Sequence, residues 1–247
     1  ITPAEEVLQT FEDLTRVGKI RYAGLSDVPA WYAARMQTLA QASHAHPLVS
    51  LQLQYSLVER NIEREYVDLA LELGCGITAW SPLGMGLLSG KYRRSTQGHD
   101  SETEGRLQAM KQSGLAALQD KLAPRNWEIV AALEDAARAS GLSMAQAAIQ
   151  WVARRPAVGA VILGARTLEQ FEDNLAALDT PMPQESLRAL DQASALPMQF
   201  PYSFFAQNQQ AGIHGGVAVG DKPDGYLQPV RIAAADGDID ARMKTRK

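Results

Sequence analysis

Hydrophobic residues along the chain follow two spacings, one typical of helices and one typical of strands. Apolar residues three or four positions apart predict helices near residues 3–17, 29–43, 62–73, 130–140, 143–153, 168–178 and 184–194. Short apolar runs bounded by glycine, proline or polar residues predict strands near residues 20–25, 49–57, 76–81 and 158–163. Each predicted strand is followed by at least one predicted helix, so we expect βα units and a parallel sheet.

Residues at the ends of the predicted helices support this pattern. Thr2 and Glu5 have the spacing of a capping box before the first helix, and Ser143 precedes another helix as a capping residue. Two stretches carry little periodic signal. We expect residues 93–122 to form a surface insertion. We expect one domain over residues 1–226 and a mobile tail over residues 227–247.

The number of predicted strands indicates half of a known architecture. Four βα units are half of a closed (β/α)₈ barrel of the TIM type, an α/β fold. Because a helix precedes the first strand, we expect the four other strands to come before it. A half-barrel has two unpaired edge strands, and we expect it to expose an apolar inner surface and apolar patches beside the break.

Composition narrows the classes of partner. Of 247 residues, 46% are hydrophobic and 21% are charged, as in a soluble globular protein, and the net charge of −4 argues against a nucleic-acid partner. No apolar run is long enough to cross a bilayer, and the first residues do not resemble a signal peptide. The one cysteine, Cys75, permits neither an intrachain disulfide nor a metal site of several cysteines. We expect a buried, inert thiol in a cytoplasmic protein.

The segment AWSPLGMGLLSGKY, residues 79–92, carries the clearest chemistry. It is the end of a predicted strand followed by a loop with three glycines, and such a loop can bring backbone N–H groups close to a pyrophosphate. Trp80 stands at the C-terminal end of the strand, which is the functional edge of a barrel. Its indole can stack on a flat ring, or it can simply close the barrel rim.

Two other segments have side chains suited to parts of a dinucleotide. Gln52 lies on the polar face of its strand, where a ligand amide or a neighbouring side chain can satisfy it. Gly164 leaves room at the start of a later helix, and Arg166 adds a cation where a helix N-terminus already favours anions. A guanidinium in this position suits a 2′-phosphate. Thr167 and Gln170 have capping-box spacing with or without a ligand.

Four segments of the chain resemble the aldo/keto reductases. GKIRYAGLSD at 18–27, SLQLQYSLVER at 50–60, AWSPLGMGLLSGKY at 79–92 and VILGARTLEQFEDN at 161–174 are similar to the fifth, sixth, seventh and eighth strand motifs of that family. The resemblance extends over residues 1–226. It implies the second half of a barrel that binds NADP(H), with the first four strands absent from this chain.

The resemblance also implies roles for individual residues. It implies that Trp80 stacks on the nicotinamide and that Ser26 and Gln52 bind its carboxamide. The diphosphate would lie along Ser81, Leu83, Gly84 and Leu87. The adenosine 2′-phosphate and the adenine would lie near Gly164, Arg166, Thr167, Gln170 and Asn174.

Two residues of these motifs have a second interpretation. Asp27 departs from the asparagine that the family has beside its serine, and it can instead cap the helix that Pro29 opens. Arg60 is expected to be a structural ion-pair partner.

The function implied by the resemblance is the NADPH-dependent reduction of aldehydes and ketones to alcohols, with a small carbonyl compound as substrate. The family's catalytic Tyr, Lys, Asp and His lie on the first four strands, so we assign no catalytic residue here. None of the four histidines ends a predicted strand; they are His44, His46, His99 and His214. The aromatic side chains of Phe204, Phe205 and Tyr226 would line a substrate pocket or take part in packing.

Three hypotheses follow from this half-match. The chain is a reductase that lacks its N-terminal half, or a non-catalytic nucleotide-binding or regulatory subunit similar to the potassium-channel β-subunits, or a half-barrel completed by another chain. The last hypothesis includes a homo-oligomer and a complementing N-terminal half.

Overall fold

The computed structural model of the chain describes residues 2–92, 122–205, 212–213 and 215–217. It divides into two compact units, Ile1–Ser194 and Ala195–Lys247. In the second unit the described residues include one short 3₁₀ helix, η4 (Tyr202–Phe205). The expected tail over 227–247 and nearly all of the expected insertion over 93–122 lie outside the described residues, as do His99, His214 and Tyr226.

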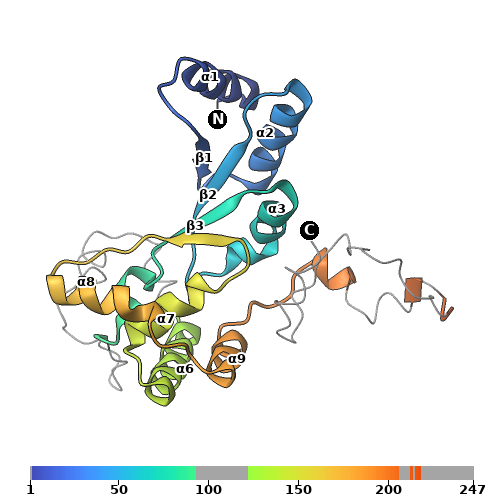
Figure 1. Cartoon of the computed structure of the whole chain (residues 1–247). Helices are drawn as coiled ribbons and strands as arrows, with labels where there is room; N and C mark the ends of the chain where they lie inside the picture. The colour runs from blue at the N-terminus through green and yellow to red at the C-terminus, as the bar shows by residue number, and fades with distance from the viewer. Residues whose placement is uncertain (1, 93–121, 206–211, 214, 218–247) are drawn as a thin grey trace. The chain divides into compact units, whose positions relative to one another are not determined.

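The first unit contains a four-stranded parallel sheet in the order β1-β2-β3-β4 (Figure 1). Its strands are β1 (Ala23–Ser26), β2 (Leu48–Gln54), β3 (Gly76–Trp80) and β4 (Val158–Val161). The four predicted parallel strands are therefore confirmed. Residues 20–22 precede β1 because the N–H groups of Lys19 and Ile20 donate back to the carbonyl of Leu14 at the helix end. β2 ends before Tyr55, where Ser56 and Glu59 close a tight turn.

Helices connect the strands and flank them. Before and between the first three strands lie α1 (Ala4–Arg16), α2 (Ala30–Ser43), η1 (Asn61–Arg64) and α3 (Tyr66–Leu73). Between β3 and β4 the described helices are η2 (Gly84–Ser89), α6 (Pro124–Ser140) and α7 (Met144–Ala153). After β4 come α8 (Leu168–Leu175), η3 (Ala176–Leu178) and α9 (Gln184–Ala193). The single helix expected over 62–73 is interrupted at Glu65 and begins as a 3₁₀ turn.

Helix capping follows the sequence at Ser143 and departs from it at the starts of α1 and α2. Ser143 and Gln146 form a reciprocal capping box at the start of α7. The expected box at Thr2 is absent, because α1 begins after Pro3 with no side-chain cap. The α2 helix likewise begins after Pro29 without a side-chain cap, and Asp27 makes other contacts, which are described below.

The two faces of the sheet differ in chemistry because side chains alternate along each strand. Leu51, Leu53, Ile77 and Ala79 are at most 3% exposed and belong to the hydrophobic core under the helices. The other face is exposed or half-buried and carries Gly24, Ser26, Ser50, Gln52, Thr78 and Trp80. The expectation of an apolar inner surface is therefore wrong: the described inner face consists of small and polar residues with one indole.

On this inner face, position 24 requires a glycine for a steric reason. A Cβ atom at this position would lie 2.2 Å from Oγ and 2.9 Å from the backbone oxygen of Ser50 on the neighbouring strand. Because the backbone oxygen cannot move without disturbing the strand, no larger residue fits without a shift of β1 or β2.

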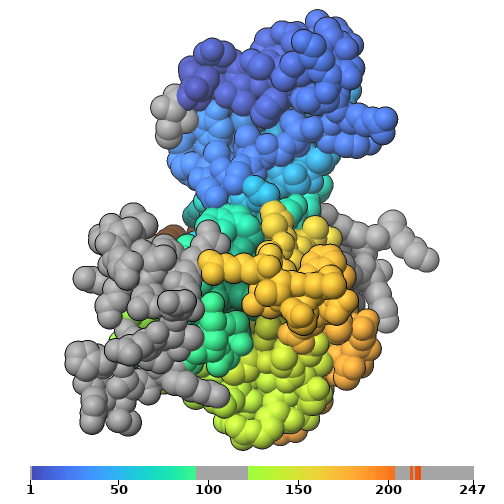
Figure 2. Space-filling view, turned by 90° about the vertical axis from the view of Figure 1, so that its left-hand side faces the viewer, coloured from blue at the N-terminus to red at the C-terminus, as the bar shows by residue number. Residues whose placement is uncertain are grey.

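Exposed apolar residues gather beside both edge strands, as expected. Beyond β4, the stripe along α8 and η3 is 47–67% exposed and consists of Leu168, Phe171, Leu175 and Leu178. This segment lies at the surface that faces the viewer in Figure 2, in yellow to orange. A groove of about 260 Å³ runs between it and β4, lined by apolar residues that include Ile149 and Val161. Near β1 the exposed residues are Val17, Tyr22 and Trp31.

Candidate dinucleotide site

The C-terminal ends of the parallel strands bring the predicted cofactor residues to one rim. Ser26 at the end of β1 pairs in register with Gln52 on β2, and Gln54 pairs with Trp80 at the end of β3. The backbone N–H of Ile162 donates to Ala79, so the loop that follows β4 leaves the sheet at the same edge. Residues from four consecutive strand ends, separated by up to about 140 positions in sequence, therefore share this edge.

The side chain of Trp80 is held by Asp27, for which the sequence had suggested a role as a helix cap. Its Nε1–H donates to Oδ1 of Asp27 at 3.2 Å, while the hydroxyl of Ser26 donates to Oδ2 at 3.3 Å. Asp27 has a left-handed backbone, with φ of +49°, and its N–H donates to the carbonyl of Gln52. Asp27 follows Ser26 directly, but its partner Trp80 lies 53 positions later in the sequence. No local sequence pattern predicts a contact over that separation.

Two glutamines on β2 face the same side as Trp80. The side chain of Gln52 is exposed. The Nε2 atom of Gln54 is buried and has no hydrogen-bond partner in the described part of the chain. A buried amide donor without an acceptor is costly, and it commonly marks the place of a ligand or an ordered water. Gln54 lies two positions after Gln52 and therefore shares its face of β2, although the sequence motifs do not mark it as a site residue.

The glycine-rich loop after β3 follows a left-handed path. Ser81, Gly84, Met85 and Gly86 all have positive φ, and the hydroxyl of Ser81 accepts the N–H of Met85 at 3.1 Å. A Cβ atom on Gly84 would lie 2.8 Å from Cγ2 of Val58. A compact loop of this kind can present backbone N–H groups to an anion.

The side chains expected to line that loop differ in exposure. Leu83 is half-buried, whereas Leu87 is 0% exposed and belongs to the core. Any contact with a ligand at Leu87 would therefore come from its backbone.

The loop between β4 and α8 is fixed by three of the predicted residues. Thr167 caps α8 and accepts the N–H of Gln170 at 3.3 Å, and Oε1 of Gln170 accepts the N–H of Arg166 at 3.0 Å. Nδ2 of the buried Asn174 donates to the carbonyl of Gly164 at 3.5 Å. The guanidinium of Arg166 is exposed and makes no hydrogen bond or ion pair within the described residues. Of this group, Arg166 is the charged side chain left for an anion.

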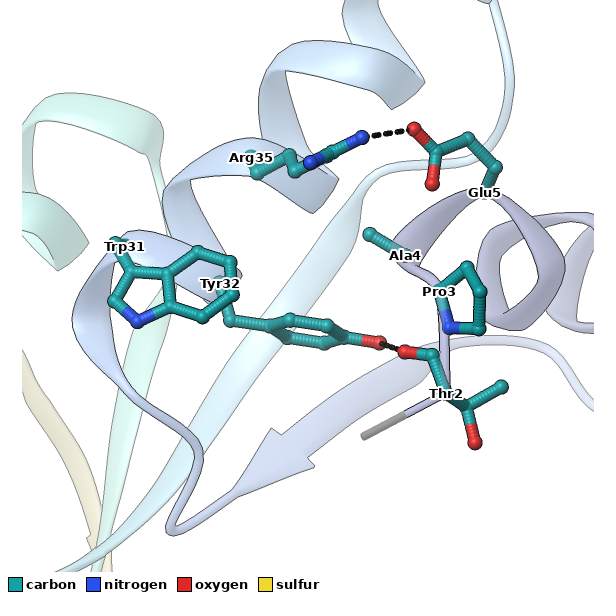
Figure 3. Close-up of a pocket in the computed structure, with 7 residues that line it drawn as sticks. All are labelled: Thr2, Pro3, Ala4, Glu5, Trp31, Tyr32 and Arg35. Atoms are coloured by element: carbon teal, nitrogen blue, oxygen red, sulfur yellow. Dashed lines mark hydrogen bonds and ion pairs between the residues drawn. The ribbon is translucent and has the colours of Figure 1, made fainter.

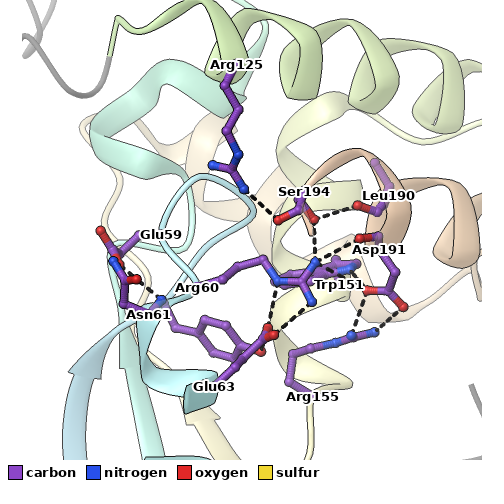
Figure 4. A network of polar contacts seen from close by, with 11 residues as sticks. Glu59, Arg60, Asn61, Glu63, Arg125, Trp151, Arg155, Leu190, Asp191 and Ser194 are labelled. Carbon is purple, nitrogen blue, oxygen red and sulfur yellow. Dashed lines mark hydrogen bonds and ion pairs between the residues drawn. The ribbon is translucent and has the colours of Figure 1, made fainter. Parts of the chain in front are cut away.

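Arg60 has the structural role expected for it (Figure 4). Its Nε and Nη2 donate to the two carboxylate oxygens of Glu63, each at 2.8 Å, and its Nη1 donates to the hydroxyl of Ser194 at 2.6 Å. The indole N–H of Trp151 and the guanidinium of Arg155 both donate to Oδ1 of Asp191. The network ties the loop after β2 to α7 and to the end of α9.

Three other reactive side chains among the described residues are held by burial or by structural contacts. Tyr55 is 1% exposed and donates to Glu63 at 2.6 Å; burial, and then the Glu63 carboxylate, raise the pKa of its phenol well above the usual value. A tyrosine that acts as a catalytic acid near neutral pH needs a lowered pKa instead. The exposed ring of His46 contacts Glu12 at 2.8 Å. Cys75 is buried, as expected, and burial raises the pKa of its thiol.

A small pocket of about 160 Å³ lies elsewhere, between the first turns of α1 and α2 (Figure 3). Its polar groups contact one another: Arg35 pairs with Glu5, and the hydroxyl of Tyr32 donates to the carbonyl of Thr2. Trp31 forms its outer wall. None of its lining residues belongs to the strand-end rim.

The described residues contain neither a metal-binding cluster nor a membrane-spanning helix. They contain no group of three or more His, Cys, Asp or Glu side chains able to hold a metal ion. No helix among them has the length and apolar character required to cross a membrane.

A parallel βα fold with polar and aromatic side chains collected at the strand ends is the architecture of a barrel-type protein, in which this rim is the functional edge. The sequence matches the aldo/keto reductase family over residues 1–195. The chain belongs to that family, and the matched region coincides with the first compact unit to within one residue.

The curated proteins similar to this chain include one named as an oxidoreductase and one named as a reductase. The chain is 33% identical over 190 residues to uncharacterized oxidoreductase YrpG of Bacillus subtilis (strain 168), covering 77% of this chain and 54% of that protein. It is 28% identical over 193 residues to versiconal hemiacetal acetate reductase of Aspergillus parasiticus, covering 77% and 53%. It is 31% identical over 192 residues to protein tas of Escherichia coli (strain K12), covering 76% and 53%. The chain spans about half the length of these relatives.

Proposed function

We propose that this chain is the dinucleotide-binding half of an NADPH-dependent reductase that converts aldehydes or ketones to alcohols. The observation that carries the proposal is the shared rim, where Trp80, Gln52 and the loop of Arg166 stand at the ends of neighbouring parallel strands. The family membership supports an oxidoreductase with a nicotinamide cofactor. The preference for NADPH and the carbonyl substrate go beyond family membership and are part of our proposal.

The residues at the rim fit the parts of such a cofactor. The indole of Trp80 suits a flat ring, and the side chains of Gln52 and Gln54 supply amide donors and acceptors that a carboxamide can satisfy. A diphosphate would lie along the left-handed loop from Ser81 to Gly86, where the N–H groups of Gly84, Met85 and Gly86 donate within the loop and the hydroxyl of Ser81 can donate to a ligand. The exposed guanidinium of Arg166 suits a 2′-phosphate. When bound, the cofactor would supply the hydride.

The second part of the proposal is that four further βα units complete the barrel. The outer edges of β1 and β4 have no partner strand within the described residues. The apolar stripe of α8 and η3 and the groove beside β4 offer an uncovered surface next to one of these edges. A barrel strand and its helix would pair with β4 and cover that surface. We propose that the complement precedes β1 in sequence or is supplied by another chain.

The proposed chemistry needs groups that the described strands do not carry. Reduction of a carbonyl requires a proton donor near the developing alkoxide. Tyr55 is engaged by Glu63, and Tyr22 is 74% exposed beside β1 with no Lys–Asp pair in contact with it. We therefore propose that the acid lies on the complementing strands, and that this chain binds and orients the dinucleotide.

A binding experiment tests the proposal. NADPH and NADH are titrated into the 247-residue chain while its tryptophan fluorescence is recorded, with Trp80→Phe as a second protein. We expect saturable quenching by NADPH that is largely lost in the variant, because Trp80 is the indole placed at the rim. Absence of binding by the unaltered chain would overturn the proposal. Binding with no turnover after the complementing strands are supplied would favour a regulatory, nucleotide-binding subunit.

A further inference from the structure

The carboxylate of Asp27 stands at the centre of the proposed nicotinamide side of the rim. It follows β1 directly, and its own N–H is bonded to the carbonyl of Gln52 on β2, which anchors the residue to the sheet edge. Its left-handed φ of +49° fixes the direction in which the side chain leaves the backbone. Asp27 is therefore a fixed group of the rim rather than part of a free loop.

Both oxygens of this carboxylate are oriented by donors from the site. Oδ1 accepts the indole N–H of Trp80 on β3, and Oδ2 accepts the hydroxyl of Ser26 on β1. Both donors are neutral, and Asp27 forms no ion pair with a described residue. Within the described part of the chain, no cationic side chain therefore lies at ion-pair distance from the carboxylate beside the indole edge.

We propose that Asp27 is a specificity-determining residue that positions Trp80 and makes the site prefer the oxidised, cationic form of the nicotinamide over the reduced, neutral form. This inference rests on the proposed function. A fixed negative charge attracts a positively charged ring and has no net charge to attract in the reduced ring. An asparagine in the same place could still accept the Trp80 N–H through its oxygen, but it would supply only a dipole.

The proposal has a consequence for the direction of the reaction. In alcohol oxidation, a hydride passes from the carbinol carbon to the oxidised nicotinamide, the hydroxyl proton is released, and a carbonyl compound is formed. Tighter binding of the oxidised cofactor favours its occupancy of the site and slows its release after carbonyl reduction. We therefore infer that Asp27 moves this protein toward alcohol oxidation relative to an otherwise identical protein with asparagine.

The test compares the dissociation constants of NADP⁺ and NADPH by calorimetric titration of the full chain and of Asp27→Asn. We expect the variant to bind NADP⁺ about three- to tenfold more weakly, with little change for NADPH, which is the order expected for two unit charges about 4 Å apart in water at this exposed carboxylate. Added salt should reduce the preference of the unaltered chain and leave that of the variant unchanged. Asp179→Asn, an exposed aspartate after η3, is the matched charge control.

A second measurement reports on Trp80 without any cofactor. In nitrogen-15 spectra the indole N–H of Trp80, identified by its loss in Trp80→Phe, should shift and exchange faster in Asp27→Ala than in Asp27→Asn. An unchanged ratio of the two dissociation constants in Asp27→Asn, or an indole signal unaffected by Asp27→Ala, would overturn the inference while leaving the proposed function intact. If the unaltered chain binds neither dinucleotide, both fail.

Discussion

The guanidinium carbon of Arg60 lies 5.0 Å from the centre of the Trp151 ring, and that of Arg155 lies 4.4 Å from the same ring. Arg60 is also paired bidentately with Glu63 and bonded to Ser194 at the end of α9. Because the Arg60 side chain is only 9% exposed, water cannot replace these contacts freely when they are removed.

Arg60→Ala should therefore lower the free energy of unfolding by about 3 kcal/mol, the lower end of the range for removing one partner of a buried ion pair. Urea unfolding followed by circular dichroism measures this change. The matched control is Arg138→Ala, whose side chain is 71% exposed and pairs with Asp135 within α6. The control should change the stability by less than about 0.5 kcal/mol. Equal losses in the two variants would contradict a buried network at Arg60.

Arg166→Ala should separate NADPH from NADH. We expect the variant to bind NADPH more weakly by about 1.5–3 kcal/mol, the range for hydrogen bonds to charged groups, and to bind NADH almost unchanged. The control is Arg154→Ala, an exposed arginine that follows α7 and precedes the N-terminal end of β4. Fluorescence titration gives the dissociation constants of both cofactors for the unaltered chain and for each variant. Equal weakening of NADPH and NADH would mean that Arg166 does not contact the 2′-phosphate.

The chain alone should not reduce aldehydes with NADPH above background. A missing general acid costs about 10²–10⁴ in rate, and missing substrate-orienting groups cost more. The assay follows NADPH absorbance with a panel of aldehydes and small ketones, first on the 247-residue chain and then on the same chain joined to the four complementing βα units. Robust turnover by the chain alone would contradict the absence of a catalytic residue.

The apolar stripe beside β4 should behave as an interface and not as part of the core. Leu175 and Leu178 are 55% and 60% exposed, so the double change to Gln should leave the stability of the isolated chain within about 0.5 kcal/mol and raise its solubility. The same double variant should bind the complementing units more weakly, as measured by sedimentation. Leu190→Gln, at 0% exposed, is the contrasting variant and should unfold the chain.

Tyr55 should make stability fall at high pH. Burial raises the pKa of its phenol in the folded chain above the unfolded value of about 10, so the folded state holds this proton more tightly. The contribution is fully present below about pH 10 and is lost as the pH rises toward the folded pKa, with a slope of at most about 1.4 kcal/mol per pH unit. Tyr55→Phe should lack this slope, so the stabilities of the two proteins should converge between pH 10 and 11.5. Parallel curves would contradict the assignment.

The sequence predicted the elements whose signals are local. Strand periodicity located β3 and β4 closely, and the predicted capping residue Ser143 does cap α7, where it forms a capping box with Gln146. The first helix was different: Thr2 has the spacing for a capping box, yet its carbonyl accepts the hydroxyl of Tyr32, a partner 30 positions away. A contact at that distance in sequence leaves no local pattern.

The candidate site likewise combines features that the sequence predicts with contacts that it does not. The strand-end positions of Ser26, Gln52 and Trp80 follow from parallel pairing once the strands are known. The contact between Asp27 and Trp80 depends on a left-handed backbone and on the register of three strands. The burial of Leu87 depends on how the loop folds back on the core, so a motif that lists it as a lining residue does not say which of its atoms faces the ligand.

The order of the strands in the sheet is also their order along the chain. Each hydrogen-bonded pair is therefore joined by a single crossover, and no strand has to be inserted between two that have already paired. During synthesis the sheet can grow one strand at a time, with β1 and β2 able to pair while the residues of β4 are still inside the ribosome. The loop of Arg166, which follows the last strand, would then be the part of the rim that is completed last.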